Sequence, residues 1–201
     1  MLTFTAENHV YRWKGNVVPS VTQILSPLSD FSMVAPATLE YARARGVAVH
    51  KCVQLDILDD LDEASVAQEL TGYLSAWRAF RKDCSVTAAD FGEPEKQMYH
   101  DLYGYAGTPD VPIFLDNKWG VLDVKTAEAM GDAWGPQTAA YLDLINDNTP
   151  KGQHKIENRY SLRLRDNGTY RLDKFTDRAD WQVFLSCLTL HRWKESHGRS
   201  A

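Results

Sequence analysis

The stretch that most constrains the fold is residues 104–125, GYAGTPDVPIFLDNKWGVLDVK. Residues 111–115 form a short apolar run, a turn-forming segment follows, and residues 119–125 resume a strand pattern. Because side chains alternate between the two faces of a strand, Asp123 and Lys125 share one face. A carboxylate and an ammonium on so apolar a strand are costly to bury unless they pair with each other or with a metal ion. The pattern predicts two joined strands that carry a polar site.

Asp110 stands at the start of the first strand, so each strand offers one carboxylate. Carboxylates from neighbouring strands suit a hard divalent cation such as Mg²⁺, which prefers oxygen ligands. The backbone carbonyl of Val124 lies between the acid and the lysine and would complete the protein ligands. Lys125 would then orient a water or stabilise the charge that develops on phosphorus. The alternative interpretation of Asp-x-Lys is an ordinary surface ion pair at an exposed strand end.

Residues 37–58 show a long helical pattern in which Arg43, Gly46 and His50 recur on one face. A glycine inside a helix costs about 1 kcal/mol relative to alanine, which indicates that another group approaches the backbone at Gly46. An isolated histidine on a helix is more often an ordinary core or surface residue than a ligand. His50 therefore becomes a metal-ligand candidate only together with its neighbours.

Three further candidates flank the central strands. Glu95 begins a strand-like segment, 96–103, and is either a third carboxylate of the metal site or part of a solvated acidic loop. Residues 126–135 form a loop that is expected to be mobile over a substrate. In the helix that follows, Gln137 and Tyr141 are four residues apart and therefore lie on one face.

The remaining chain is predicted to build the scaffold. Residues 2–5 and 9–18 are predicted strands, and Ser20 or Thr22 is predicted to cap a short helix. Residues 64–82 form a predicted helix with an apolar and aromatic core stripe.

The carboxyl-terminal part is predicted as a hairpin of strands 156–165 and 169–175, followed by a helix over 178–195. The arginines that alternate with the core side chains of the first strand are expected to face solvent, and the alternative is that they contact phosphates: Arg159, Arg163 and Arg165. The large apolar side chains of the helix are expected to pack inward: Trp181, Phe184, Leu185, Leu188 and Trp193.

Composition limits the classes of protein. With 201 residues, 44% hydrophobic and 24% charged, the chain suits one globular domain, and it has neither a membrane-length apolar run nor a signal peptide, so we expect a cytoplasmic protein without membrane contact. The three cysteines are far apart and form no Cys-x-x-Cys pair, which disfavours a zinc or iron-sulfur site. The net charge of −5 argues against coating nucleic acid by charge alone, but it permits an enzyme whose acids hold a cation.

Taken in order, His50, Glu95, Gly-Thr-Pro-Asp110, Leu-Asp123-Val-Lys125-Thr and Gln137-x-x-x-Tyr141 resemble the PD-(D/E)xK nuclease superfamily, in its RecB-like branch. The spacing of thirteen residues between the two aspartates agrees with that pattern, and the resemblance covers residues 40–145. The segment Pro-Ser-Val-Thr-Gln-Ile-Leu at 19–25 is similar to the opening motif of mitochondrial genome-maintenance exonucleases and related phage exonucleases.

The resemblance implies a role for each matching residue. The implied Mg²⁺ or Mn²⁺ ligands are His50, Asp110, Asp123 and the Val124 carbonyl. Lys125 would position or activate water, Glu95 would be a further metal or water contact, and Gln137 and Tyr141 would support Lys125 and the substrate strand. The implied DNA contacts are Ser20, Thr22, Arg43 and Tyr141. The chain lacks the four clustered cysteines of the iron-sulfur members and the phosphate-binding loop of the helicase-nucleases.

We therefore expect one α/β domain over 1–201, with a restriction-endonuclease-like core of a central mixed β-sheet flanked by helices, plus an appended C-terminal β-hairpin and helix. The expected function is metal-dependent hydrolysis of DNA phosphodiesters, as an exonuclease on single-stranded ends in phage DNA recombination. The alternatives are a structure-specific endonuclease and a nucleic-acid-binding protein that does not cleave. A serine or cysteine hydrolase lacks its Gly-x-Ser-x-Gly motif here. Cleavage polarity, DNA or RNA preference and a ring-shaped oligomer stay open.

Overall fold

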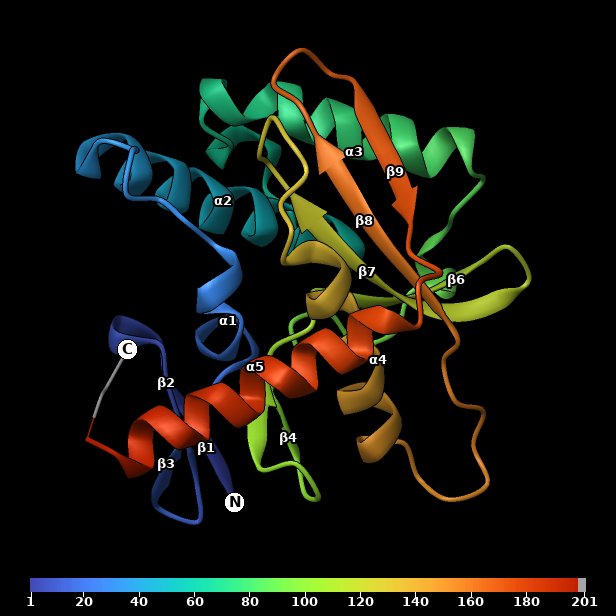
Figure 1. Ribbon diagram of the computed structural model, residues 1–201. Helices are drawn as coiled ribbons and strands as arrows, with labels where there is room; N and C mark the ends of the chain where they lie inside the picture. The colour runs from blue at the N-terminus through green and yellow to red at the C-terminus, as the bar shows by residue number, and fades with distance from the viewer. Residues whose placement is uncertain (199–201) are drawn as a thin grey trace.

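The computed structural model describes residues 1–198 and is a mixed α/β fold built on a four-stranded sheet in the order β6-β7-β8-β9 (Figure 1). The strands are β6 (Val111–Leu115), β7 (Lys118–Lys125), β8 (Asn158–Leu164) and β9 (Tyr170–Lys174). The outer pairs are antiparallel and the central pair, β7 with β8, is parallel. The predicted mixed sheet is confirmed. The C-terminal hairpin is not appended, however, because β8 and β9 form half of this sheet.

The β6-β7 hairpin fixes the register of the candidate site. Its turn residues Asp116 and Asn117 have φ values of 55° and 60°, the left-handed conformation that a tight two-residue hairpin turn requires. Val111 pairs with Leu122 in this register, so the position just before β6 is level with Asp123. The turn therefore places Asp110 beside the acid of β7.

Helices cover both faces of the sheet (Figure 1). On one face lie α2 (Pro36–Ile57) and α3 (Thr71–Asp83), which pack on Leu122 and Val124 of β7. On the other face lie α4 (Trp134–Asn148) and α5 (Ala179–Ser196), which pack on Val121. The alternation of β7 side chains thus divides the apolar residues between two cores, and Asp123 and Lys125 point to the α4 side.

Two smaller sheets of short strands, one amino-terminal and one from the middle of the chain, lie outside the central sheet. A three-stranded antiparallel sheet contains β1 (Leu2–Thr5), β2 (Val10–Trp13) and β3 (Asn16–Val18), and a two-stranded sheet contains β4 (Met98–His100) and β5 (Tyr105–Gly107). The backbone N–H of Ala106 donates to the carbonyl of Pro19 at 2.9 Å. This contact docks the segment before the short helix α1 (Val21–Ile24) beside the strand that leads into the site.

Several element boundaries differ from the sequence predictions. The helix predicted over 64–82 begins only at Thr71, because residues 63–65 and 68–70 are separate 3-10 turns. The strand predicted over 96–103 is limited to residues 98–100. Trp193 was expected to pack inward, but it is 47% exposed on the outer side of α5. None of the helices in the described residues is long and apolar enough to cross a membrane.

The arginines of β8 also correct a prediction. Arg159 and Arg163 are buried rather than solvated, whereas Arg165 is exposed. The prediction assumed a hairpin with one solvated face, but β8 is a central strand whose second face is covered by α4 and the chain around it. Arg159 is neutralised by Asp180 at 2.8 Å and Arg163 faces Asp173 at 3.3 Å. The two arginines are therefore part of the interior.

Candidate active site

Asp110 is fixed by the backbone of the neighbouring strand. Its carboxylate is 9% exposed, and Oδ2 accepts a hydrogen bond from the backbone N–H of Val124 at 2.5 Å. A buried carboxylate that accepts a backbone N–H has one oxygen committed and one oxygen free for another partner. The free oxygen of Asp110, Oδ1, faces His50.

His50 reaches this acid from α2. Its Nε2 lies 2.9 Å from the carbonyl oxygen of Val124, and because a carbonyl only accepts, Nε2 carries the hydrogen. Its Nδ1 lies 3.3 Å from Asp110 Oδ1 and 3.5 Å from Glu95 Oε1. In the neutral ring, the Nδ1 lone pair would face two carboxylate oxygens. That arrangement is repulsive unless a proton or a metal cation lies between them.

Glu95 is brought in by an unusual backbone conformation. Its φ is 55°, in the left-handed region, and its N–H donates to the carbonyl of Asp110 at 2.8 Å. For a residue with a side chain this conformation costs roughly 1–2 kcal/mol, so the surrounding contacts must hold it. The ligand atoms of His50, Glu95 and Asp110 all lie within 4.8 Å of one another. We refer to these three residues as the acidic triad.

A second group lies beside the acidic triad, on β7 and α4. Lys125 Nζ is 2.7 Å from Asp123 Oδ2 and donates to Gln137 Oε1 at 2.8 Å. Gln137 Nε2 in turn donates to the hydroxyl of Tyr141 at 3.3 Å, as their spacing on α4 predicts. Tyr141 therefore orients the amide so that its oxygen faces the ammonium. We refer to these four residues as the lysine relay.

Val124 joins the triad to the relay. Its N–H serves Asp110 and its carbonyl serves His50, while its neighbours on β7 are Asp123 and Lys125. The sequence predicts this carbonyl as a metal ligand; here it accepts a hydrogen bond from His50, and its second lone pair keeps the metal-ligand role a prediction. The predicted site residues are thus brought together around one residue of β7.

Three carboxyl groups lie close together in the site, and the pKa of each is shifted. Burial raises the pKa of Asp123 to about 6 against the opposing charge of Lys125, and burial also raises the pKa of Glu95. Asp110 is different: burial is outweighed by the positive charges of His50 and Lys125, and its pKa is lowered. The pKa of His50 is raised well above its ordinary value because the neighbouring acids outweigh burial. The residues alone therefore favour an added positive charge at Nδ1.

The residues that are predicted to contact DNA differ in their exposure to solvent. Ser20 is 2% exposed, and its Oγ caps α1 by accepting the N–H of Gln23 at 3.1 Å. Ser20 is therefore not exposed for a direct contact with phosphate, whereas Thr22 and Arg43 are exposed.

The space around Gly46 corrects another prediction. A Cβ at Gly46 would meet only Thr126 Oγ1 at 3.8 Å, an ordinary contact, so the predicted close approach there is wrong.

Three residues near the site make contacts that the sequence did not predict. Arg45 donates to the carbonyl of Thr126 at 3.3 Å, and Arg163 donates to the carbonyl of Glu128 at 2.9 Å. Trp134 is buried beside both Lys125 and Arg163. The loop that follows Lys125, expected to be mobile, is therefore tied at two backbone carbonyls. Because each partner is distant in the chain, no local pattern would have identified these contacts.

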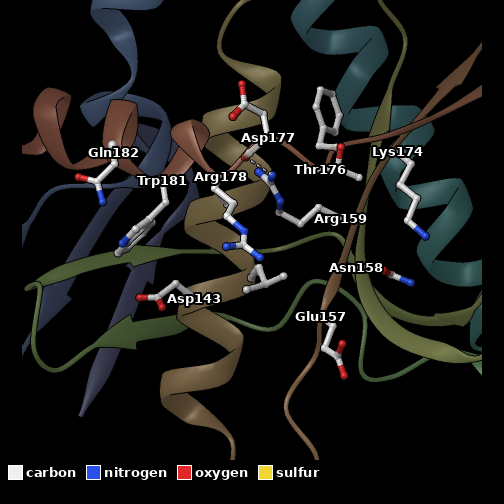
Figure 2. A pocket seen from close by; sticks show the side chains of 13 residues that line it. Asp143, Glu157, Asn158, Arg159, Lys174, Thr176, Asp177, Arg178, Trp181 and Gln182 are labelled. Atoms are coloured by element: carbon white, nitrogen blue, oxygen red, sulfur yellow. Dashed lines mark hydrogen bonds between the residues drawn. The ribbon is translucent and has the colours of Figure 1, made fainter.

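A sizeable cavity lies elsewhere, between α4, β8 and the start of α5 (Figure 2). Its volume is about 630 Å³, and it is lined by the side of α4 that carries Asp143, by Arg178 and by Trp181. Figure 2 shows the side chains of Asp143, Arg178 and Trp181 around it. No residue of the acidic triad or the lysine relay lines this cavity. Its size therefore has no bearing on the chemistry of the site.

Comparison with known proteins finds similarity in fold but none in sequence family. The sequence matches no family model and no curated protein. Among solved structures, its fold is similar to a crystal structure of LHK-Exo in complex with dAMP, with 11% identity over 90% of this chain and 89% of that chain and a TM-score of 0.39. At this level of likeness, function has to be argued from the residues themselves.

The residues present fit a hard divalent cation. The acidic triad offers two carboxylate oxygens and one imidazole nitrogen within 4.8 Å, a donor set that suits Mg²⁺ or Mn²⁺ better than a thiophilic metal. Within residues 1–198, the buried Oδ2 of Asp123 makes no well-aligned hydrogen bond despite its proximity to Lys125. A buried acceptor without such a bond is one that a cation or a water can satisfy.

Proposed function

We propose that this protein is a metal-dependent nuclease that hydrolyses DNA phosphodiester bonds, acting as an exonuclease on single-stranded ends. The observation that carries the proposal is the Nδ1 atom of His50, which faces two carboxylate oxygens at 3.3 and 3.5 Å, close to the ion pair of Lys125 and Asp123. Two carboxylates that face one histidine nitrogen, beside the ammonium of Lys125, are arranged to bind a cation and a phosphate rather than for stability alone.

In this proposal, His50, Glu95 and Asp110 hold Mg²⁺ or Mn²⁺, with Asp123 as the fourth candidate ligand. Such a cation polarises a phosphoryl oxygen and lowers the pKa of water. The exposed Thr22 and Arg43 contact the phosphates of the strand, and the ordinary attraction of Arg43 for phosphate requires no base recognition. The preference for ends and single strands rests on the resemblance of the motifs.

The lysine relay supplies the other half of the mechanism. Lys125 Nζ keeps one hydrogen for the Gln137 oxygen and directs the rest toward Asp123 and the reacting phosphate. Tyr141, whose pKa is raised well above its ordinary value by burial, stays protonated and holds the Gln137 amide in this orientation. The ammonium is thus fixed before substrate arrives, which is how a charge contributes most to stabilising a developing negative charge.

The test is a cleavage assay with end-labelled linear single-stranded DNA, linear duplex DNA and circular DNA, each with Mg²⁺, Mn²⁺ or EDTA. We expect linear single strands to be shortened from an end with either metal and no cleavage in EDTA. Lys125→Ala is expected to lower the rate by about a thousandfold. The matched control is Lys118→Ala on the same strand, which removes a 53% exposed lysine paired with Glu157.

Other results would assign other functions. Cleavage of circular as well as linear DNA would indicate an endonuclease. Binding of DNA without cleavage under every metal condition, unchanged by Lys125→Ala, would indicate a nucleic-acid-binding protein that does not cleave, and it would contradict the proposal.

A further inference from the structure

The ammonium of Lys125 has an aromatic neighbour in addition to its two polar partners. Its Nζ lies 5.8 Å from the centre of the Trp134 ring. Trp134 opens α4 three residues before Gln137, and residues three apart on a helix lie on one face. The same helix surface therefore presents an amide and an indole to Lys125.

The same ring contacts a second cation. Arg163 is the direct partner of Lys125 across the parallel pair of β7 and β8, so the two cationic side chains lie next to each other on one face of the sheet. The Arg163 guanidinium carbon is 5.7 Å from the centre of the Trp134 ring. Like charges at adjacent positions repel, whereas the negative face of an indole ring attracts both. Trp134 is thus the shared partner of two neighbouring cations.

The ring itself is held firmly. It is 8% exposed, and Arg163 is anchored by the Glu128 carbonyl at 2.9 Å and by Asp173 at 3.3 Å. Within residues 1–198, the buried Nε of Arg163 has no hydrogen-bond partner. A buried guanidinium that leaves one N–H unpaired depends more on its remaining contacts, including the ring.

We propose that Trp134 is a positioning residue: its indole ring holds the Lys125 ammonium in the site and keeps it apart from Arg163. The effect on cleavage rests on the proposed nuclease function, but the effect on the ammonium does not. An aliphatic side chain in place of Trp134 fills most of the space without attracting either cation. Phenylalanine retains an aromatic face.

The experiment compares Trp134→Phe, Trp134→Met and Trp134→Leu with the wild-type protein. The matched control is Trp119→Leu, because Trp119 lies on β7 six residues, about 20 Å, before Lys125 and packs against Phe114. Two quantities are measured for each folded variant: kcat and KM on linear single-stranded DNA at saturating Mn²⁺, and the labelling rate of Lys125 by an amine-reactive reagent, read by mass spectrometry. Lys118 on the same strand serves as the internal standard.

We expect Trp134→Met to lower kcat about tenfold and to raise Lys125 labelling severalfold, with KM within about twofold of wild type. Trp134→Phe is expected to stay within about threefold of wild type in both quantities, and Trp119→Leu is expected to change neither. The recovery by phenylalanine separates an aromatic contact from simple filling of space.

Three outcomes would overturn the inference. The first is wild-type kcat and labelling in a folded Trp134→Met variant. The second is an equal loss in the Phe and Met variants, which would show that the aromatic face is not responsible. The third is a failure of both Met and Leu variants to fold while Phe folds, which would assign the ring a packing role. If the wild-type protein cleaves no DNA, the nuclease proposal fails, and Lys125 labelling alone decides this inference.

Discussion

Helix α2 carries two charged clusters that are built in opposite ways. Near its end, the Asp56 carboxylate accepts hydrogen bonds from Trp77 Nε1 at 2.7 Å, from Arg78 at 2.9 Å and from Arg81 at 2.6 Å. Six residues earlier, His50 meets two carboxylates and presents a ring nitrogen to both. Both oxygens of Asp56 therefore accept hydrogen bonds from side-chain donors, whereas the carboxylates of Asp110 and Glu95 share one nitrogen of His50.

The pKa shifts of Asp56 and Glu95, one carboxylate from each cluster, also run in opposite directions. Burial alone would raise the pKa of Asp56, but Trp77, Arg78 and Arg81 outweigh burial and lower it, so the charged form is the favoured one. Burial raises the pKa of Glu95 and Asp123 above their ordinary values. The Asp56 cluster joins α2 to α3 and is complete by itself. The acidic triad needs an added positive charge at His50 Nδ1, from a proton or a metal cation.

The largest expected effect separates the two clusters by activity. Asp110→Asn removes one charge from the triad while preserving the shape of the side chain, and we expect it to lower the cleavage rate by about a thousandfold at saturating Mn²⁺. Asp56→Asn is the matched control, with the same chemical change in the other cluster, and it should stay within about threefold of wild type below its melting temperature. Equal losses in the two variants would remove the functional distinction.

A smaller effect separates them by stability. Asp56 is 9% exposed at its side chain, and Asp56→Asn is expected to lower the free energy of unfolding by about 2 kcal/mol at pH 7, since a buried acceptor of three donors loses its charge. A folded-state pKa below the unfolded value contributes stability above that unfolded value, and this stability is lost as the pH falls through the folded pKa. The difference between wild type and variant should therefore shrink below about pH 4. Urea unfolding at pH 7 and pH 3 measures it, and a pH-independent difference would contradict the role of charge.

Glu95→Gln should give the smallest effect, with the opposite sign. Because the pKa of Glu95 is raised on folding, its ionised form destabilises the folded protein at pH 7, and this penalty disappears as the pH falls below the unfolded value. In EDTA, we expect the variant to be more stable than wild type by about 0.5–1 kcal/mol at pH 7, with no gain near pH 4. Thermal unfolding at the two pH values is sufficient. A destabilised variant at pH 7 would show that Glu95 is a structural partner of His50.

The parts that were predictable from sequence are those with local periodicity. Alternation along β7 placed Asp123 and Lys125 on one face, and four-residue spacing placed Gln137 with Tyr141; both contacts are present. The capping role of Ser20 was also predictable, because a serine before a short helix has a local partner.

The parts that were not predictable depend on distant partners. The burial of Arg163 follows from the position of β8 inside the sheet, and its strand pattern is the same as that of a solvated strand. The left-handed conformation of Glu95 depends on a hydrogen bond to Asp110 fifteen residues later. Trp134 falls in the segment that the sequence predicts as a loop, and its two cationic neighbours come from two strands.

Metal binding by the acidic triad can be measured by calorimetric titration of the metal-free protein with Mn²⁺, performed on wild type, His50→Ala, Asp110→Asn and Lys125→Ala. We expect wild type and Lys125→Ala to bind Mn²⁺ and the two triad variants to bind it at least about tenfold more weakly, because each loses a ligand. Asp56→Asn should bind as wild type does. Equal Mn²⁺ affinity in wild type and both triad variants would contradict the claim that these residues form a metal site.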